Sequence, residues 1–206
     1  AFAGMTAAIR EREARILYQS GHDLVTELPN RMNAEAAIQR ELSGRPGQPA
    51  ALLMVGLGRV PEIIKTMGHA VCDRVMREAG SRIRAPSGNE LVARATDTQF
   101  SVFLPGCGRQ EAIVAAFRML DALAEPYRES GLTLDLAPAV GIALSPAHAS
   151  EANGLLRRAD EAMYSAKQAR AGTRRAGLGR LFATVTGRRA GRAGARTDAP
   201  VVGVAA

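Results

Sequence analysis

The residues best placed to contact phosphate are two glycines that follow an apolar run, Gly56 and Gly58. A dinucleotide-binding loop needs a third glycine three residues later, and a Walker-type loop ends in Gly-Lys-Ser/Thr, because both bring backbone amides against phosphates. The chain contains neither pattern. The two glycines alone therefore do not predict a phosphate-binding loop.

Metal ligands and nucleophiles are equally sparse. His22, His69 and His148 have no second His, Glu or Cys at the spacing of a metal site. Cys72 and Cys107 are too few for a zinc cluster or a disulfide framework, and no serine or cysteine lies in a recognised nucleophile motif. Residue types and spacing alone leave the chemistry of the chain open.

Four short motifs are more informative because they occur in a fixed order. They are His22–Arg31 (HDLVTELPNR), Gly68–Asp73 (GHAVCD), Val140–Ala143 (VGIA) and Arg158–Lys167 (RADEAMYSAK). Together they resemble the motifs of GGDEF domains, the diguanylate cyclases of bacterial signalling, over about residues 22–171. The resemblance implies an α/β (α+β) fold of the nucleotidyl-cyclase type, with a central, mostly antiparallel five-stranded sheet flanked by helices.

The family joins two GTP molecules into cyclic di-GMP, with one half-site from each subunit of a dimer. Phosphoryl transfer of this kind uses Mg²⁺ held by carboxylates, because the metal neutralises charge that develops on the phosphate oxygens. The resemblance therefore predicts acidic side chains at two places, the end of the first strand and the GGDEF hairpin.

Both places lack those acids in this chain. The Gly-Gly-Asp-Glu-Phe signature falls on Thr96-Asp97-Thr98-Gln99-Phe100, and the metal-binding aspartate of the first strand falls on Gly56. Asp97 is displaced by one position, and neighbouring strand residues point to opposite faces, so it is not expected to replace the lost acid. We expect no catalytic residue and no bound metal at these positions.

The nucleotide contacts that the resemblance implies are half retained. The guanine-binding Asn falls on Ile64, the guanine-binding Asp on Asp73, and the phosphate-contacting Lys on Lys167. Asp73 and Lys167 are thus candidate nucleotide contacts, although a solvated surface charge is an equally good interpretation of each. The inhibitory Arg-x-x-Asp motif falls on Ser87 and Glu90, which lack the arginine that would grip the product.

The elements that must position these residues follow from the apolar patterning. We expect helices over 33–42, 61–68, 69–83, 110–123 and 151–170, and strands over 50–55, 91–95, 100–104, 132–136 and 139–144. The unbroken apolar run 50–55 is typical of a strand covered on both faces. Strands 91–95 and 100–104 are predicted to form a hairpin, strand 132–136 to continue into 139–144, and Ala36, Ala37 and Leu42 to face inward.

The net charge of +7 lies entirely in the C-terminal part of the chain. From Arg170 onward there are eight arginines and one acid, Asp198, so the rest of the chain is neutral. We expect residues 172–206 to form a disordered Arg/Gly/Ala-rich tail, removable without loss of stability. Residues 21–171 would be the GGDEF domain, and residues 1–20 a signalling helix whose apolar stripe could make a weak homodimer.

Composition excludes several classes of function. Aromatic residues make up 4% of the chain and Trp is absent, which argues against a stacking platform for single-stranded nucleic acid, so no specific nucleic-acid partner is expected. No apolar run reaches the roughly 20 residues of a membrane span. We expect a cytoplasmic location, including as the cytoplasmic part of a membrane-bound sensor.

The main hypothesis is a catalytically inactive GGDEF domain that acts as a regulatory or interaction module in cyclic di-GMP signalling. Its partners would be other signalling domains of a longer protein or a separate protein. Two alternatives stay open: a weakly active diguanylate cyclase, and a GTP-binding allosteric domain without turnover that uses Asp73 and Lys167. No cofactor is expected, because GTP and Mg²⁺ would belong only to residual family activity.

Overall fold

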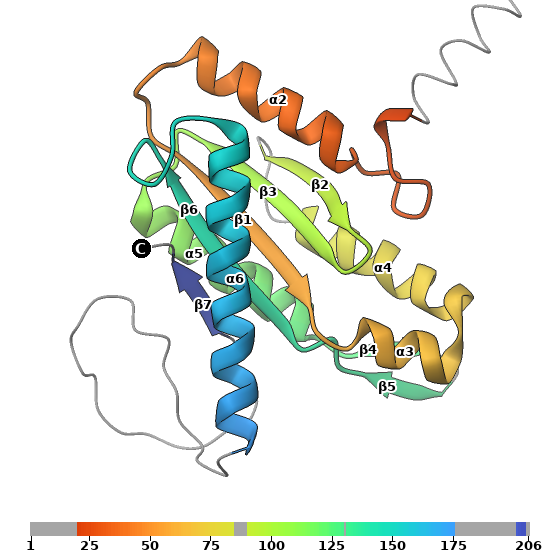
Figure 1. Cartoon of the computed structure of the whole chain (residues 1–206). Coiled ribbons are helices and arrows are strands. Elements are labelled where there is room, and N and C mark those ends of the chain that lie inside the picture. The colour runs from red at the N-terminus through yellow and green to blue at the C-terminus, as the bar shows by residue number, and fades with distance from the viewer. Residues whose placement is uncertain (1–19, 85–89, 130, 176–200, 205–206) are drawn as a thin grey trace, which may run out of the picture.

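The computed structural model describes residues 20–84, 90–129, 131–175 and 201–204 (Figure 1). The elements run in the order α2 (Arg31–Gly44), β1 (Ala50–Leu57), α3 (Val60–Met67), α4 (His69–Arg84), β2 (Leu91–Thr96), β3 (Gln99–Pro105), α5 (Arg109–Ala124), β4 (Tyr127–Glu129), β5 (Leu132–Leu134), β6 (Pro138–Ser145), α6 (Ala152–Arg175) and β7 (Val201–Val204). Five strands form one sheet in the order β2-β3-β1-β6-β7, which is antiparallel except for the β6–β7 pair. Strands β4 and β5 make a separate hairpin. The predicted fold class is confirmed.

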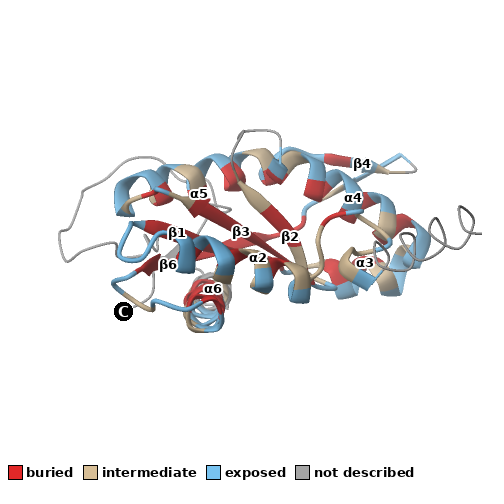
Figure 2. Ribbon diagram, turned by 90° about the horizontal axis from the view of Figure 1, so that it is seen from above, coloured by how far each residue is buried: buried red, intermediate tan, exposed pale blue. Residues whose placement is uncertain are grey.

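Strand β1 is the centre of the molecule and is buried along its whole length. Ala51, Leu53, Val55 and Leu57 pack with α3, α4 and α5, whereas Ala50, Leu52 and Met54 pack with α2 and α6. Figure 2 shows the resulting layers, with α4 and α5 above the sheet and α2 and α6 below it. Because side chains alternate along a strand, position 56 faces α6.

Helix α6 lies unusually close to strand β6 at Gly141. A Cβ at this glycine would lie 2.2 Å from both the Ala159 carbonyl oxygen and the Met163 amide nitrogen. Since no real Cβ approaches backbone atoms so closely, only glycine allows this docking depth. The close approach brings the following turns of α6 down over the end of β1.

Most of the predicted elements are present within one or two residues at each end. The hairpin connection is shorter than expected, because Thr96 and Gln99 belong to the strands and leave Asp97 and Thr98 as the turn. The prediction for the inward face of α2 was wrong at Ala36, which is exposed, and Ala37 is only half-buried. The buried side chains of α2 are Ala34, Ile38 and Leu42, one every four residues.

The prediction that strand 132–136 continues into 139–144 was also wrong. Leu132–Leu134 pairs with Tyr127–Glu129 outside the central sheet, and Pro138–Ser145 pairs with β1. Between them Ala137 adopts a φ of +48°, and its amide donates to the Asp135 carboxylate at 2.8 Å. This left-handed residue, followed by Pro138, turns the chain from one sheet into the other.

The C-terminal part differs from the expected tail at both of its ends. Helix α6 continues to Arg175, and Val201–Val204 forms strand β7 parallel to β6. The free edge of β6 explains the strand, because its backbone groups need partners that a short Val-rich segment can provide. The proposed helix of residues 1–20 lies almost wholly outside the described residues, as do residues 176–200. Within the described part no helix is long and apolar enough to cross a membrane.

Candidate functional site

The positions that the sequence analysis assigned to metal binding meet at one end of the sheet. Gly56 of β1 pairs with Gln99 of β3, and the Leu57 amide donates to the Thr98 carbonyl at 2.9 Å. Phe100, Val102 and Leu104 of β3 pack with the α4–α5 layer, so Gln99 faces α6 as Gly56 does. The structure therefore brings together Gly56, Thr98 and Gln99 beneath the second half of α6.

Lys167 of α6 occupies the space that a side chain at position 56 would need. A Cβ on Gly56 would lie 2.6 Å from the Lys167 Nζ, 2.7 Å from its Cε and 2.5 Å from the Met163 Sδ. Burial lowers the pKa of the Lys167 ammonium, and the charge of Asp160 partly offsets this effect by raising it. A cationic amine thus lies where the family resemblance expects a metal-binding carboxylate.

A hydrogen bond ties the hairpin to the same helix. Gln99 Nε2 donates to Asp160 Oδ1 at 3.1 Å. Asp160 precedes Lys167 by two helical turns, so both side chains lie on the α6 face that covers the site. A glutamate at position 99 would set two carboxylates against each other, whereas the amide of Gln99 supplies a donor.

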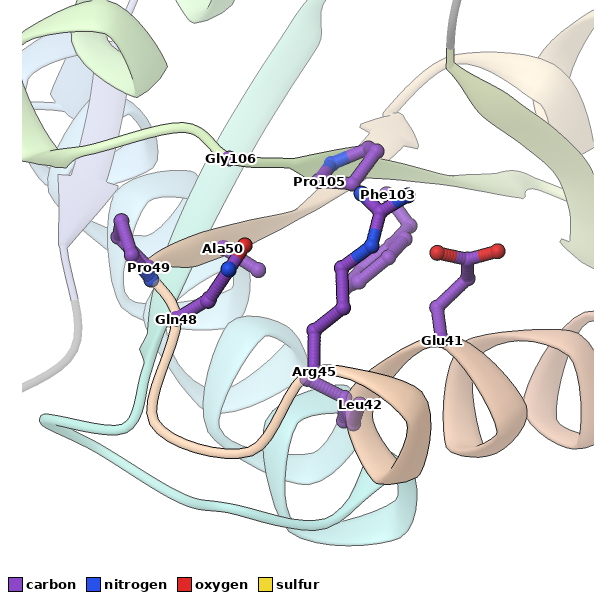
Figure 3. A pocket seen from close by; sticks show the side chains of 9 residues that line it. All are labelled: Glu41, Leu42, Arg45, Gln48, Pro49, Ala50, Phe103, Pro105 and Gly106. Carbon is purple, nitrogen blue, oxygen red and sulfur yellow. The ribbon is translucent and has the colours of Figure 1, made fainter.

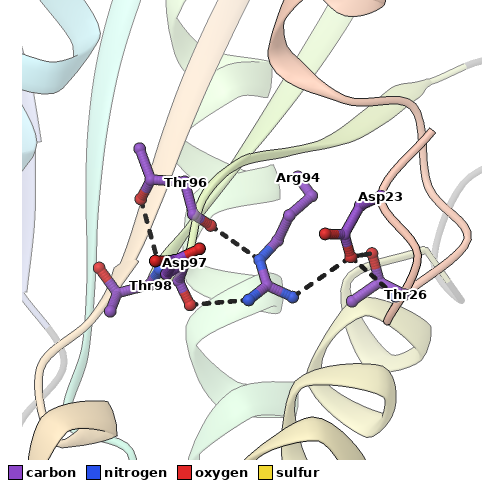
Figure 4. Close-up of polar contacts among 6 residues, drawn as sticks. All are labelled: Asp23, Thr26, Arg94, Thr96, Asp97 and Thr98. Atoms are coloured by element: carbon purple, nitrogen blue, oxygen red, sulfur yellow. Dashed lines mark hydrogen bonds and ion pairs between the residues drawn. The ribbon is translucent and has the colours of Figure 1, made fainter. Parts of the chain in front are cut away.

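Arg94 holds the hairpin turn in shape (Figure 4). Its guanidinium donates to the Thr96 carbonyl at 2.7 Å and to the Asp97 carbonyl at 2.8 Å, and it forms an ion pair with Asp23 at 3.5 Å. Asp23 in turn accepts hydrogen bonds from the amide and the hydroxyl of Thr26. Arg94 and the motif residues Asp23 and Thr26 therefore hold the turn and the preceding loop in place.

The remaining candidate residues lie apart from this cluster. Asp73 is half-buried in the first part of α4, and among the described residues no hydrogen bond or ion pair joins it to Gly56, Gln99 or Lys167. Ile64, at the expected guanine-binding position, packs against the core, and its side chain has no hydrogen-bonding group for a base. Glu90 is half-buried, and one of its carboxylate oxygens has no hydrogen-bond partner in the described chain.

Neither cysteine is a ready nucleophile. Both thiols are buried. Burial raises the pKa of Cys107 to about 11, and burial is also the main cause that raises the pKa of Cys72. A thiol needs a lowered pKa to react as the thiolate near neutral pH.

The residues of the cluster do not fit a divalent metal. Mg²⁺ prefers several oxygen ligands, commonly carboxylates. Here Asp160 contacts the cluster, but one of its oxygens accepts a hydrogen bond from Gln99, and the Lys167 ammonium covers Gly56. Among the described residues no group of three or more His, Cys, Asp or Glu is placed to hold a metal ion. No catalytic step through Mg²⁺ is supported at this site.

A small cavity lies at the other end of β1 (Figure 3). Glu41, Leu42 and Arg45 of the α2 end line it together with Phe103 and Pro105. Its volume is about 10 Å³, which is room for about one water molecule. The cavity is too small for a nucleotide and does not extend to the Gly56 cluster.

The chain is similar to known proteins over most of its length. The family model described as "Diguanylate cyclase, GGDEF domain" matches residues 20–173. The chain belongs to the GGDEF family. The predicted resemblance is confirmed.

Curated and solved relatives agree with this assignment. Diguanylate cyclase TpbB of Pseudomonas aeruginosa is 34% identical over 174 residues, which is 82% of this chain and 40% of TpbB. The isolated GGDEF domain of TpbB superposes with a TM-score of 0.68 at 35% identity, covering 72% of this chain and 89% of that structure. A sensory box/GGDEF protein of Caulobacter crescentus gives 0.66 at 27% identity, covering 72% and 99%. The chain thus spans less than half the length of TpbB.

The sequence did not predict three contacts of this candidate site. Asp160 as the acceptor for Gln99, Met163 beside Gly56, and Arg94 as the clamp of the turn were not predicted. The spacing of Asp160 and Lys167 on one helix face was available as a signal for the first of these. No sequence signal indicated how closely α6 would approach β1.

Proposed function

We propose that this GGDEF domain does not turn over GTP and acts instead as a regulatory or interaction module in cyclic di-GMP signalling. The observation that carries the proposal is that the sheet register places Gly56 beside Gln99, so that neither of the paired positions supplies a carboxylate. A divalent metal there lacks the carboxylate ligands that would offset its charge, because the acid of the cluster, Asp160, accepts a hydrogen bond from Gln99 and lies beside the Lys167 cation. Removing such metal electrostatics costs several kcal/mol of transition-state stabilisation.

The retained motifs support a role as a scaffold. Arg94, Asp23 and Thr26 keep the hairpin and the loop before α2 in place, while Gln99 joins the hairpin to α6. A domain that keeps its fold, but in which the Lys167 side chain covers Gly56, can still transmit a conformational signal or bind a protein. We further propose that its partners are other domains of a longer chain or a separate signalling protein, since the chain spans only 40% of TpbB. Self-association through residues 1–20 stays a prediction, as does a cytoplasmic location.

Isothermal titration calorimetry on the full chain tests this proposal. We would titrate GTP with and without Mg²⁺, and cyclic di-GMP in a separate run, with the GGDEF domain of the diguanylate cyclase TpbB as the positive control. The proposal predicts no saturable binding of any of the three to this chain.

Each positive result has a distinct meaning. Mg²⁺-dependent GTP binding would overturn the proposal, because it requires metal ligands that the cluster lacks. GTP binding that is independent of Mg²⁺ and lost in Lys167→Ala would instead establish the GTP-binding alternative. Binding retained in Lys167→Ala would place the nucleotide away from this cluster and would contradict the prediction that the chain binds none of the three ligands.

A further inference from the structure

Helix α5 carries an apolar strip on its outer side that is left uncovered by the described chain. Val114 is 42% exposed and Phe117 is 44% exposed, on the helix that forms the upper surface in Figure 2. Four exposed polar residues surround the pair: Gln110, Glu111, Arg118 and Asp121. No ion pair within the described residues involves Arg118 or Asp121.

The strip combines a hollow with an exposed aromatic side chain beside it. Glu111, Val114, Ala115 and Arg118, with Gln110, line a shallow hollow of about 270 Å³. The first four are spaced i, i+3, i+4 and i+7, which is the set of four residues that forms the hole in knobs-into-holes helix packing. Phe117 does not line the hollow but stands next to it, one turn after Val114. An aromatic side chain of another helix could therefore enter this hollow while Phe117 enters an equivalent one.

The polar residues are complementary to a second copy of the same helix in antiparallel orientation. When Val114 faces Phe117 of the second copy, the register also places Gln110 opposite Asp121, an amide donor against a carboxylate. Glu111 then lies within two residues of facing Arg118, an axial offset of about 3 Å that an arginine side chain can span. Glu111 and Arg118 are seven residues apart and therefore lie on the same side of α5. When two copies pack antiparallel, this side of one helix lies next to the same side of the other.

A parallel arrangement would lose this complementarity. Identical residues would then lie opposite one another, Glu111 against Glu111 and Asp121 against Asp121, and like charges oppose association. Glu111 precedes the apolar pair and Arg118 follows it, so the charges on α5 are complementary to those of a second α5 that runs in the opposite direction. This property favours a two-fold symmetric partner over an unrelated protein.

We propose that the outer face of α5 is a homodimerisation surface, on which a second copy docks its own α5 antiparallel and inserts Phe117 into the hollow beside Val114. The proposal goes beyond the inactive site and does not depend on it, because α5 lies on the opposite face of the sheet from α6. The contact is small and belongs to the weak, reversible class of interfaces.

Sedimentation velocity of the full chain over a range of concentrations up to about 1 mM tests the surface. A reversible monomer–dimer equilibrium is expected. Phe117→Ala should weaken dimerisation at least tenfold, whereas the matched control Tyr164→Ala, which removes an exposed aromatic side chain from α6, should leave it unchanged.

A charge-exchange pair distinguishes α5 from any other dimer contact. Glu111→Arg and Arg118→Glu should each weaken dimerisation, and the double variant should recover it. Thermal unfolding of each variant controls for the helix cap, because Glu111 accepts a hydrogen bond from the Gly108 amide at 2.6 Å. A chain that stays monomeric at every concentration would overturn the proposal. So would a dimer unaffected by Phe117→Ala, as expected for association through residues 1–20, or a double variant as weak as the single ones.

Discussion

Gly141 offers a direct test of how α6 is positioned over the site. In Gly141→Ala the new methyl group would lie 2.2 Å from the Ala159 carbonyl oxygen and from the Met163 amide nitrogen. Both atoms belong to the backbone of α6, so a rotamer change cannot relieve the clash. The helix must move away from β6 by more than 1 Å, which loosens its packing on the sheet.

The cost of this movement can be bounded. Overpacking a core usually destabilises a protein by 1–3 kcal/mol, and a clash with backbone lies at the upper end, so we expect a loss of about 3 kcal/mol. For a chain of this size each kcal/mol shifts Tm by roughly 2–4 °C, which gives a decrease of about 6–12 °C. Urea unfolding followed by circular dichroism measures the free energy, and a thermal scan measures Tm.

Two further glycines provide graded controls. In Gly56→Ala the obstructing atoms are the ends of the flexible Met163 and Lys167 side chains, so a smaller loss than at Gly141 is expected. A Cβ at Gly44, the last residue of α2, meets nothing within 4 Å, and Gly44→Ala should be neutral or stabilising by up to about 1 kcal/mol. A Gly141→Ala chain within about 0.5 kcal/mol of the parent, or one no less stable than Gly44→Ala, would refute the close docking of α6.

Lys167 and Lys65 are the only two lysines, so NMR can follow each amine as the pH is raised. Lys167 should lose its proton below the ordinary lysine range because burial lowers its pKa, and Asp160→Asn should lower that pKa further. At pH values between the pKa of Lys167 in the folded chain and its pKa in the unfolded chain, the unfolded chain binds more protons. The free energy of unfolding should therefore rise with pH in that window. Titration of Lys167 in the ordinary lysine range would contradict a buried amine. Gln99→Glu should cost about 0.5–1 kcal/mol in urea unfolding at pH 7, because it replaces a hydrogen bond to Asp160 by two facing carboxylates, and an unchanged midpoint would refute that contact. Ending the chain after Arg175 should lower Tm and promote association, because the edge of β6 loses β7; an unchanged Tm would contradict the β6–β7 pairing.

The fold was predictable because local patterns and the motifs agree with each other. The apolar run 50–55 marks a strand buried on both faces, and the hairpin around Asp97 follows from the strands on either side of it. The break at Ala137 could not be predicted, because it depends on a left-handed residue held by the Asp135 side chain. Strand β7 was missed because a four-residue strand at a sheet edge owes its pairing to β6, far away in the chain.

The site was predictable in position but not in contacts. The family resemblance indicates that Gly56, Thr98 and Gln99 replace acidic residues, and the sheet register places Gly56 directly beside Gln99. Whether the vacated space is open depends on how deeply α6 docks, and that depth is determined by Gly141 on a different strand. The covering of Gly56 by Lys167 is therefore a tertiary property that neither motif contains.

We expect that the Gly56 cluster does not support cyclic di-GMP synthesis. The most direct measurement incubates the purified full chain with GTP and Mg²⁺ and quantifies cyclic di-GMP by chromatography and mass spectrometry, with the GGDEF domain of the diguanylate cyclase TpbB as a parallel control. We predict that the chain forms no more product than a heat-denatured sample. Cyclic di-GMP formed well above that background, in proportion to protein concentration, would show that this domain turns over GTP.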